Sequence, residues 1–370
     1  MRARLGLLPA SILALVVDFT SAYKALSDNF LRLIPSGGAD LDATNGALLA
    51  PLLVPRLPGS AGQTAAQHHF VRFFRTELPR WELEWQNSTT RAGDGDVPIA
   101  NLVFRREPPW VRPGQANLLT LAAHYDTRPS PPGFVGATDS AASCAVLMHV
   151  ARSLDRYAQQ MYDEMEALGE HGGTLAMDMG VQVVFLDGKE AAAGRPWAGP
   201  ALAGSRALAA AWEAEKRGPA AAYGFPTALN QVRLLVLLDR LGRRGGPEVP
   251  SYVQTAAWAY RALATVEARL RRLALLETPA AQRFLPQTGK RADEFGGAPP
   301  RGNDHEPFMA RGVDVLALFP DDDDDEHAAL GGEDSLDPAA VRDWARIMTG
   351  FALEWLDMME VEPVSTEGGS

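Results

Sequence analysis

Four apolar runs, each followed by a polar turn and then a longer amphipathic segment, constrain the fold of this chain most strongly. The runs are NLLTLAA (117–123), VQVVFLD (181–187), RLLVLLD (233–239) and VDVLALFP (313–320). Their apolar residues are continuous rather than alternating, which is typical of parallel strands covered by helices on both faces. The pattern therefore predicts an α/β fold: a doubly wound, mostly parallel mixed sheet with helices on both faces, in a single domain.

Amphipathic segments alternate with these runs and are predicted to be the helices. They cover residues 144–161, 201–215 and 252–276. The closing helix is predicted to begin at Asp337-Pro338, because aspartate is a favourable N-cap and proline suits the first helical position.

The chain before residue 117 has a different pattern. Residues 63–78 predict an amphipathic helix. Its apolar stripe consists of Ala66, Phe70, Phe74 and Leu78. The alternation in WELEWQNST (81–89) predicts an edge strand, and NLVFRRE (101–107) is its expected neighbour.

Composition excludes several classes of function. The formal net charge of −11 argues against nucleic acid as a partner, since a phosphate backbone demands a basic face. Cys144 is the single cysteine of the 370 residues, which excludes an internal disulfide and a cysteine-based zinc site. No apolar run reaches the roughly 18–20 residues needed to span a bilayer.

Residues 1–22 have the layout of a secretory signal peptide. MRAR supplies two arginines, LGLLPASILALVV an apolar stretch, and TSA the small residues of a cleavage site. A buried helix or a short uncleaved anchor is the alternative. Asn87-Ser88-Thr89 is a glycosylation sequon that fits a secreted chain. We therefore expect a secreted glycoprotein without stable membrane association, with its domain at 23–360 and a disordered tail at 361–370.

Acidic residues and histidines gather where the apolar runs end. They are His124, Asp126, Asp139, Glu190, Asp239, Asp304 and His327. In an open parallel sheet, ligands bind at the carboxyl ends of the strands. Imidazole and carboxylate groups both bind zinc. The sequence therefore predicts one zinc site assembled from several strand ends.

The motifs HYDTR, GATDSAAS, VVFLDGKEA, LLVLLDRLG and NDHEPFMARGVDVLALFP resemble, in this order, those of the M28 zinc peptidase superfamily. The resemblance is closer to its glutaminyl-peptide cyclotransferase branch (the glutaminyl cyclases), particularly the fungal members, and covers roughly residues 25–358. It implies a zinc aminopeptidase-like fold, and the amino termini of peptides or proteins as substrates. We also expect a monomer.

The resemblance further implies roles for individual residues. Asp139, Glu190 and His327 match the three protein ligands of one catalytic zinc. His124 and Asp239 match positions that hold a second metal in the aminopeptidase relatives, whereas in the cyclase branch they are neighbours of a single zinc.

Two other carboxylates acquire roles in the same way. Asp304, together with Asp239, resembles a hydrogen-bonded pair that handles protons in the cyclase branch. Asp126 is expected to orient a neighbouring histidine or ligand. The implied reaction is intramolecular aminolysis: the α-amine of an amino-terminal glutamine attacks its own zinc-polarised γ-carbonyl, ammonia leaves, and pyroglutamate remains.

Lys189 departs from the family at the catalytic position. The family has Gly-Glu-Glu-Ala where this chain has Gly188-Lys189-Glu190-Ala191, so lysine replaces the glutamate that acts as general acid and base. A lysine ammonium has three donors and no acceptor, and neighbouring carboxylates favour its charged form. Because general acid–base catalysis is worth about 10²–10⁴ in rate, we expect an impaired enzyme.

The substrate pocket departs from the family as well. Trp197 is expected to be the remnant of an aromatic loop that walls the pocket. Glu326 stands before His327 where the family has tryptophan, so the apolar wall against the glutamine side chain is altered.

Two alternatives to an impaired cyclase remain at this point. One is a zinc aminopeptidase or peptide hydrolase of the same superfamily, which requires a second metal at His124 and Asp239. The other is a catalytically inactive relative that binds peptide amino termini.

Overall fold

The computed structural model describes most of the predicted domain. The described residues are 25–92, 95–169, 178–190, 201–216, 225–295, 301–321 and 332–358. The predicted signal peptide (1–22), the predicted tail (361–370), Trp197, Glu326 and His327 lie outside the described residues.

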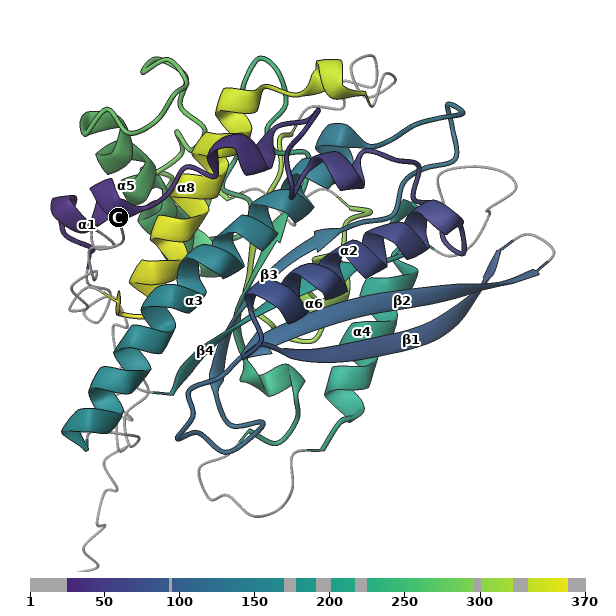
Figure 1. Cartoon of the computed structure of the whole chain (residues 1–370), viewed down its shortest axis with the longest axis horizontal. Helices are drawn as coiled ribbons and strands as arrows, with labels where there is room; N and C mark the ends of the chain where they lie inside the picture. Colours follow the sequence, from purple (N-terminus) through teal and green to yellow (C-terminus); the bar gives the residue numbers. More distant parts are fainter. Residues whose placement is uncertain are drawn as a thin grey trace, which may run out of the picture.

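One six-stranded mixed sheet organises the fold, in the order β1-β2-β4-β3-β5-β6 (Figure 1). The strands are β1 (Glu82–Ala92), β2 (Gly95–Arg106), β3 (Asn117–His124), β4 (Met179–Leu186), β5 (Val232–Leu238) and β6 (Val315–Leu318). The four strands from β4 to β6 in this order are parallel, while β1 and β2 pair antiparallel with each other and β2 with β4. The predicted mostly parallel mixed sheet is therefore confirmed, with β1 at its edge.

Helices cover both faces of the sheet. Successive residues of each buried strand point to opposite faces, so each strand contributes to two apolar cores, one on each face. Leu121 and Val236 face the larger core, whereas Ala122 and Leu237 face the smaller one. The larger core packs beneath α1 (Asp28–Leu33), α2 (Ala61–Glu77), α3 (Ala142–Leu168), α5 (Ala257–Arg272) and α8 (Pro338–Trp355). The smaller core packs against α4 (Ala203–Ala214) and α6 (Glu306–Met309).

Local signals in the sequence define several helix boundaries, of which the Asp337 cap was predicted and the Ser60 cap was not. The Ser60 hydroxyl accepts a hydrogen bond from the Gln63 amide and begins α2. The Asp337 carboxylate accepts from the Ala339 and Ala340 amides and begins α8. The helix predicted at 252–276 is shorter than expected: α5 ends at Arg272, and Ala274 takes a left-handed conformation with φ of 55°.

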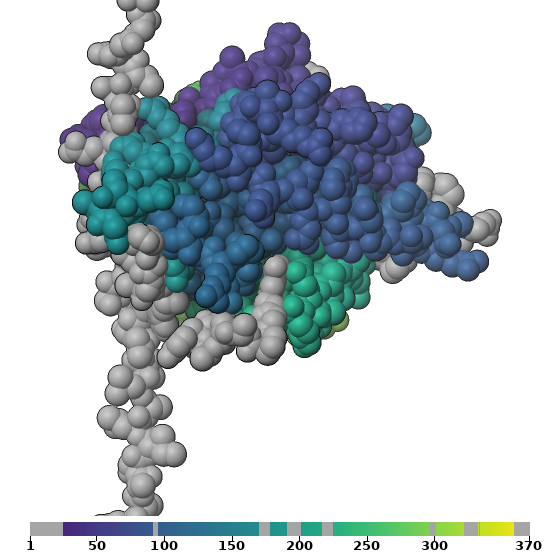
Figure 2. All heavy atoms as spheres, turned by 60° about the horizontal axis from the view of Figure 1, so that its bottom comes forward, coloured from purple at the N-terminus to yellow at the C-terminus, as the bar shows by residue number. Residues whose placement is uncertain are grey.

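The hairpin of β1 and β2 projects from the side of the molecule (Figures 1 and 2). Asn87 of the predicted sequon is exposed on the edge strand β1. Within the described ranges, no helix combines the length and apolar character that crossing a membrane requires.

Candidate metal centre

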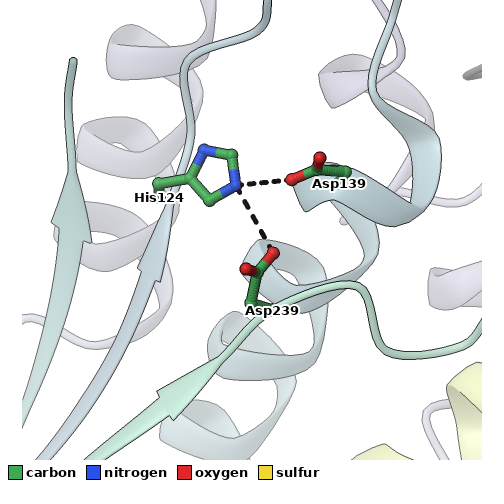
Figure 3. A group of neighbouring side chains, drawn as sticks. All are labelled: His124, Asp139 and Asp239. Atoms are coloured by element: carbon green, nitrogen blue, oxygen red, sulfur yellow. Dashed lines mark hydrogen bonds and ion pairs between the residues drawn. The ribbon is translucent and has the colours of Figure 1, made fainter. Parts of the chain in front are cut away.

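Three side chains meet at the carboxyl ends of the central strands because these strands are neighbours in the sheet. His124 is the last residue of β3, while Lys189 and Asp239 follow the ends of β4 and β5. Because β3 pairs in parallel with both β4 and β5, the carboxyl ends of these strands lie together. Figure 3 shows His124 and Asp239 converging with Asp139, which comes from the turn before α3.

Asp139 reaches this group from a tight turn. Gly136 has a left-handed φ of 56°, and a Cβ atom there would lie 2.3 Å from the carbonyl oxygen of Asp139, so the approach requires glycine. The Ser140 hydroxyl donates to the carbonyl oxygen of His124 and ties the turn to the end of β3. Oδ1 of Asp139 consequently lies 2.8 Å from Nε2 of His124.

Arg56 holds the loop that leads to this turn, and sequence reasoning missed it. Its buried guanidinium donates to the carbonyl oxygens of Tyr125 at 2.6 Å and Val135 at 2.7 Å, near the two ends of the loop. Burial lowers the pKa of Arg56 to about 10, so the group is still charged at neutral pH. Its partners are backbone carbonyls, and such contacts leave no pattern in a sequence.

The Lys189 ammonium lies in the middle of the cluster. Nζ donates to Oδ2 of Asp239 at 2.8 Å and to Oδ1 of Asp139 at 3.3 Å, and it lies 3.1 Å from Nε2 of His124. Oε1 of Glu190 is 3.7 Å from Nζ. Burial works against the charge, but the surrounding carboxylates outweigh burial and raise the pKa of Lys189 well above its ordinary value. Lys189 is thus a hydrogen-bond donor with no acceptor capacity, in agreement with the sequence argument.

The same ammonium sets the ionisation of the carboxylates around it. Burial is the largest influence and disfavours charge on Asp139 and Asp239, but Lys189 and His124 together outweigh burial. The pKa of Asp139 falls to about 2, and the pKa of Asp239 falls well below its usual range. Burial and the Asp139 charge instead raise the pKa of Glu190 to about 7. Both aspartates are therefore ionised at neutral pH, whereas Glu190 is near its titration midpoint.

Asp126 connects His124 to the segment after β4. Oδ1 of Asp126 lies 3.3 Å from Nδ1 of His124, and the Asp126 carboxylate also accepts from the backbone amides of Lys189 at 3.2 Å and Glu190 at 2.8 Å. Burial and the Lys189 charge act to lower the pKa of His124, but the hydrogen bonds to Asp126 and Asp139 and the nearby Asp239 carboxylate outweigh them and raise it. Asp126 lies where a carboxylate that orients His124 is expected.

Asp304 is buried beside this group and is joined to it indirectly. Oδ1 accepts from the Ser205 hydroxyl at 2.6 Å, while Oδ2 has no hydrogen-bond partner among the described residues. The Asn303 side chain links the two predicted proton-handling carboxylates. Its Nδ2 donates to Oδ2 of Asp239 at 2.7 Å, and its Oδ1 accepts from the backbone amide of Asp304 at 2.8 Å. Burial raises the pKa of Asp304 to about 6.

Asp187 positions the start of the Lys189 segment and was also missed. Its carboxylate accepts from the backbone amides of Ala100 and Gly188, each at 2.8 Å, and from the Gln63 amide group. These bonds fix the direction in which the chain leaves β4. The signal that could identify it in the sequence is an acidic residue placed directly after the apolar run VVFL.

The structure brings together seven of the ten predicted site residues. These seven are His124, Asp126, Asp139, Lys189, Glu190, Asp239 and Asp304. The predicted ligand His327 and the predicted pocket residues Trp197 and Glu326 lie outside the described residues, so their contacts are not part of this geometry.

The chemistry of the cluster suits a divalent metal ion. His124, Asp139 and Asp239 each offer a ligand atom, and these atoms all lie within 4.8 Å of one another. One imidazole and two carboxylates form a donor set that suits zinc. This set shares Asp139 with the predicted zinc ligands. The predicted ligand Glu190 is a close neighbour of Asp139, whose charge acts on the Glu190 carboxyl group.

The fold is that of a zinc-peptidase-like α/β protein, and comparison with known proteins identifies the class. The model of peptidase family M28 matches residues 109–352, so the chain belongs to this family. A glutaminyl-peptide cyclotransferase-like protein of Mus musculus is 33% identical over an alignment of 343 residues, which covers 90% of this chain and 80% of that protein. Within the M28 family, the similarity is thus to glutaminyl-peptide cyclotransferases.

Further relatives agree with this placement. The glutaminyl-peptide cyclotransferase of Gloydius blomhoffii is 30% identical over 318 residues, covering 84% of this chain and 80% of its own. The crystal structure of Macrostomum lignano glutaminyl cyclase superposes with a TM-score of 0.73 at 25% identity, covering 92% of this chain and 97% of that one.

Proposed function

We propose that this chain binds zinc and acts on peptides with an amino-terminal glutamine, converting it to pyroglutamate with release of ammonia, at a rate reduced by Lys189. The names of its relatives support the reaction class. The observation that carries the proposal is the strand-end cluster of His124, Asp139, Glu190 and Asp239 around that lysine.

The predicted ligands of the catalytic zinc are Asp139, Glu190 and His327. Bound zinc would supply Lewis acidity toward the γ-carbonyl of the substrate. The substrate supplies proximity, because its own amine closes a five-membered ring. The remaining task for the protein is to move a proton from the attacking amine to the departing ammonia.

Lys189 is unsuited to this task. Nζ donates hydrogen bonds to two carboxylates, and a protonated ammonium accepts no proton from the substrate amine. Asp304, which is not among the predicted zinc ligands, has a pKa of about 6 and titrates close to neutral pH. A residual activity would therefore run through Asp304, with a large loss in rate.

The test is ammonia release from a glutamine-initiated peptide, measured with zinc-loaded wild type and Lys189→Glu. We expect Lys189→Glu to be faster by about 10²–10⁴, the typical contribution of a general acid–base group. Lys290→Glu is the matched control, since Lys290 donates to the Ser251 carbonyl at 2.8 Å and contacts none of the cluster residues in its hydrogen bonds.

The outcomes separate three explanations. Equal rates for wild type and Lys189→Glu would refute the proposed impairment. Turnover by Lys189→Glu alone would support it. Zinc binding without turnover in either protein would favour the inactive peptide-binding alternative and implicate the altered pocket around Trp197 and Glu326.

We also propose that the chain is secreted and carries a glycan on Asn87. The amino-terminal pattern of residues 1–22 supports secretion. The exposed position of Asn87 on the edge strand β1 supports modification.

A further inference from the structure

A cavity outside the strand-end cluster carries charge of the sign opposite to that of the whole chain. It has a volume of about 620 Å³ and is lined by the end of α1 and the segment after it, by α3 and by α8. Its lining includes four arginines, which are Arg32, Arg152, Arg156 and Arg346. Asp40 is the only carboxylate among the described residues that line it. Because the chain has a formal net charge of −11, such a concentration of guanidinium groups indicates a site for an anion.

The charge of Arg152 is neutralised inside the protein. Its guanidinium donates to the Asp40 carboxylate and to Oε2 of Glu77, the second at 3.1 Å. The charge of Asp40, which would oppose an anion, is therefore already paired with that of Arg152. An anion in the cavity would depend on the remaining arginines.

Arg346 of α8 is a partly buried cation whose close contacts are neutral. Its Nε donates to the Ile34 carbonyl oxygen at 3.0 Å, and its Nη1 donates to the Leu275 carbonyl oxygen. Within the described ranges it forms no ion pair with a carboxylate. Burial lowers the pKa of Arg346, and the charges of Asp343 and Glu277 act against burial without outweighing it. A partly buried cation without a close counter-ion is unfavourable, and an anion in the cavity would remove this penalty.

The buried His149 ring also responds to the positive charge of this cavity. Burial lowers the pKa of His149 to about 4, and the charges of Arg152 and Arg346 act in the same direction. The Asp40 charge and a hydrogen bond to the Pro35 carbonyl oxygen act in the opposite direction and are outweighed. The ring is therefore neutral at neutral pH, so the positive charge that an anion meets comes from the arginines.

Arg32 and Arg156 are exposed at the same cavity. Arg32 lies in the last turn of α1 and forms no ion pair in the described part of the chain. The guanidinium carbon of Arg156 lies 5.9 Å from the centroid of the Tyr157 ring, which also lines the cavity. Leu33 and Tyr157 place apolar surface beside these charges.

We propose that this cavity binds a small organic molecule with a phosphate or sulfate group, whose oxygens are held by Arg32, Arg156 and Arg346. The planar guanidinium group offers several fixed donors, a geometry that suits tetrahedral oxyanions. The volume of the cavity falls in the range of roughly 300–1,000 Å³ that is typical of sites for organic ligands, so a bare ion would leave it mostly unfilled. The proposal goes beyond the proposed function, because the cavity shares no residue with the strand-end cluster.

The test is calorimetric titration of the zinc-loaded, full-length protein with phenyl phosphate, phenyl sulfate and phenol. We expect a single equivalent of phenyl phosphate or phenyl sulfate to bind, and the tighter of the two identifies the oxyanion that the site prefers. Phenol has no anionic group and should not bind. The titrations are repeated after removal of zinc with a chelator, because an oxyanion held by zinc would then be lost whereas one held by the arginines would remain.

Arginine variants locate the bound anion. Arg346→Gln should weaken binding by about 10–100-fold, the effect of losing a hydrogen bond to a charged group. Because Arg346 also bonds two backbone carbonyls, the double variant Arg32→Gln/Arg156→Gln tests the same site through two exposed side chains. Arg261→Gln is the matched control and should bind as wild type does, since Arg261 is exposed on α5 and does not line the cavity.

Three results would overturn the proposal. These are no binding of either anion to wild type, loss of binding when zinc is removed, or equal affinity of wild type and the double variant. The last result would mean that the arginines hold an adventitious ion only. Since catalysis is not measured, an inactive wild type leaves this test unaffected, and a failed anion titration leaves the proposed cyclisation open.

Discussion

Two groups of buried carboxylates in this molecule are stabilised in different ways. Glu267 of α5 accepts hydrogen bonds from the backbone amides of Phe284 and Leu285 at 2.9 and 3.0 Å, and it pairs with Arg271 at 2.8 Å. Asp343 of α8 similarly accepts from two backbone amides and one hydroxyl of the segment after α5. We call Glu267 and Asp343 the loop-anchoring carboxylates.

Asp239 and Asp304 at the strand ends lack such complete partners. Each has one oxygen without a hydrogen bond within the described residues, and Asp239 relies on side chains, chiefly Lys189 and Asn303. Backbone donors are fixed by the fold, whereas side-chain partners can be exchanged for a metal or a substrate. Under the proposed function, the loop-anchoring carboxylates therefore serve stability and the strand-end carboxylates serve chemistry.

The largest effect on stability is expected for Lys189→Leu. Removal of the cation leaves Asp139 and Asp239 close together and uncompensated, and breaking a buried ion pair in this way costs about 3–5 kcal/mol. Added zinc should recover about 2.7 kcal/mol at 100 times its dissociation constant. Urea denaturation with chelator and with zinc measures both. A metal-free loss below about 1 kcal/mol, typical of exposed ion pairs, would contradict the role given to Lys189.

A smaller and metal-independent effect is expected for Glu267→Gln. The substitution removes the charge that Arg271 and two backbone amides share, and hydrogen bonds to charged groups are worth about 1.5–3 kcal/mol. The same denaturation series should show this loss unchanged by zinc. If zinc instead restored the stability of Glu267→Gln, the loop-anchoring carboxylates would be coupled to the strand-end carboxylates, and the two groups would not differ as described.

The smallest effect is expected for Ser205→Ala, which removes the hydrogen bond to Oδ1 of Asp304 and costs about 1 kcal/mol. Burial raises the pKa of Asp304 from 3.8 to about 6, so the folded state binds more protons than the unfolded state in this interval. The stabilisation from Asp304 is complete below pH 3.8 and is lost as the pH rises through about 6.

Because the Ser205 hydroxyl acts to lower the pKa of Asp304, Ser205→Ala should move this loss to higher pH. The carbonyl stretch of the protonated acid, followed by infrared spectroscopy against pH, reports the shift directly. Identical titrations for Ser205→Ala and wild type would show that the Ser205 hydroxyl does not influence the pKa of Asp304.

The sequence by itself determined the order of strands and helices along the chain, the edge hairpin, the Asp337 cap of α8 and the gathering of histidine and carboxylate residues at the strand ends. These features depend on apolar periodicity and local hydrogen bonding, which are properties of short segments. The family resemblance supplied the likeness to glutaminyl cyclases, and comparison with known proteins confirmed it.

Only the tertiary structure decided which groups meet. The placement of β3 between β4 and β5 brings His124, Lys189 and Asp239 into contact. In the sequence, His124 lies 65 residues before Lys189, and Lys189 lies 50 residues before Asp239. The anchoring by Arg56 of a loop 69 residues away is equally invisible in the sequence. Such contacts depend on strand order and side-chain direction, because neither local propensity nor residue spacing specifies which distant segments become neighbours.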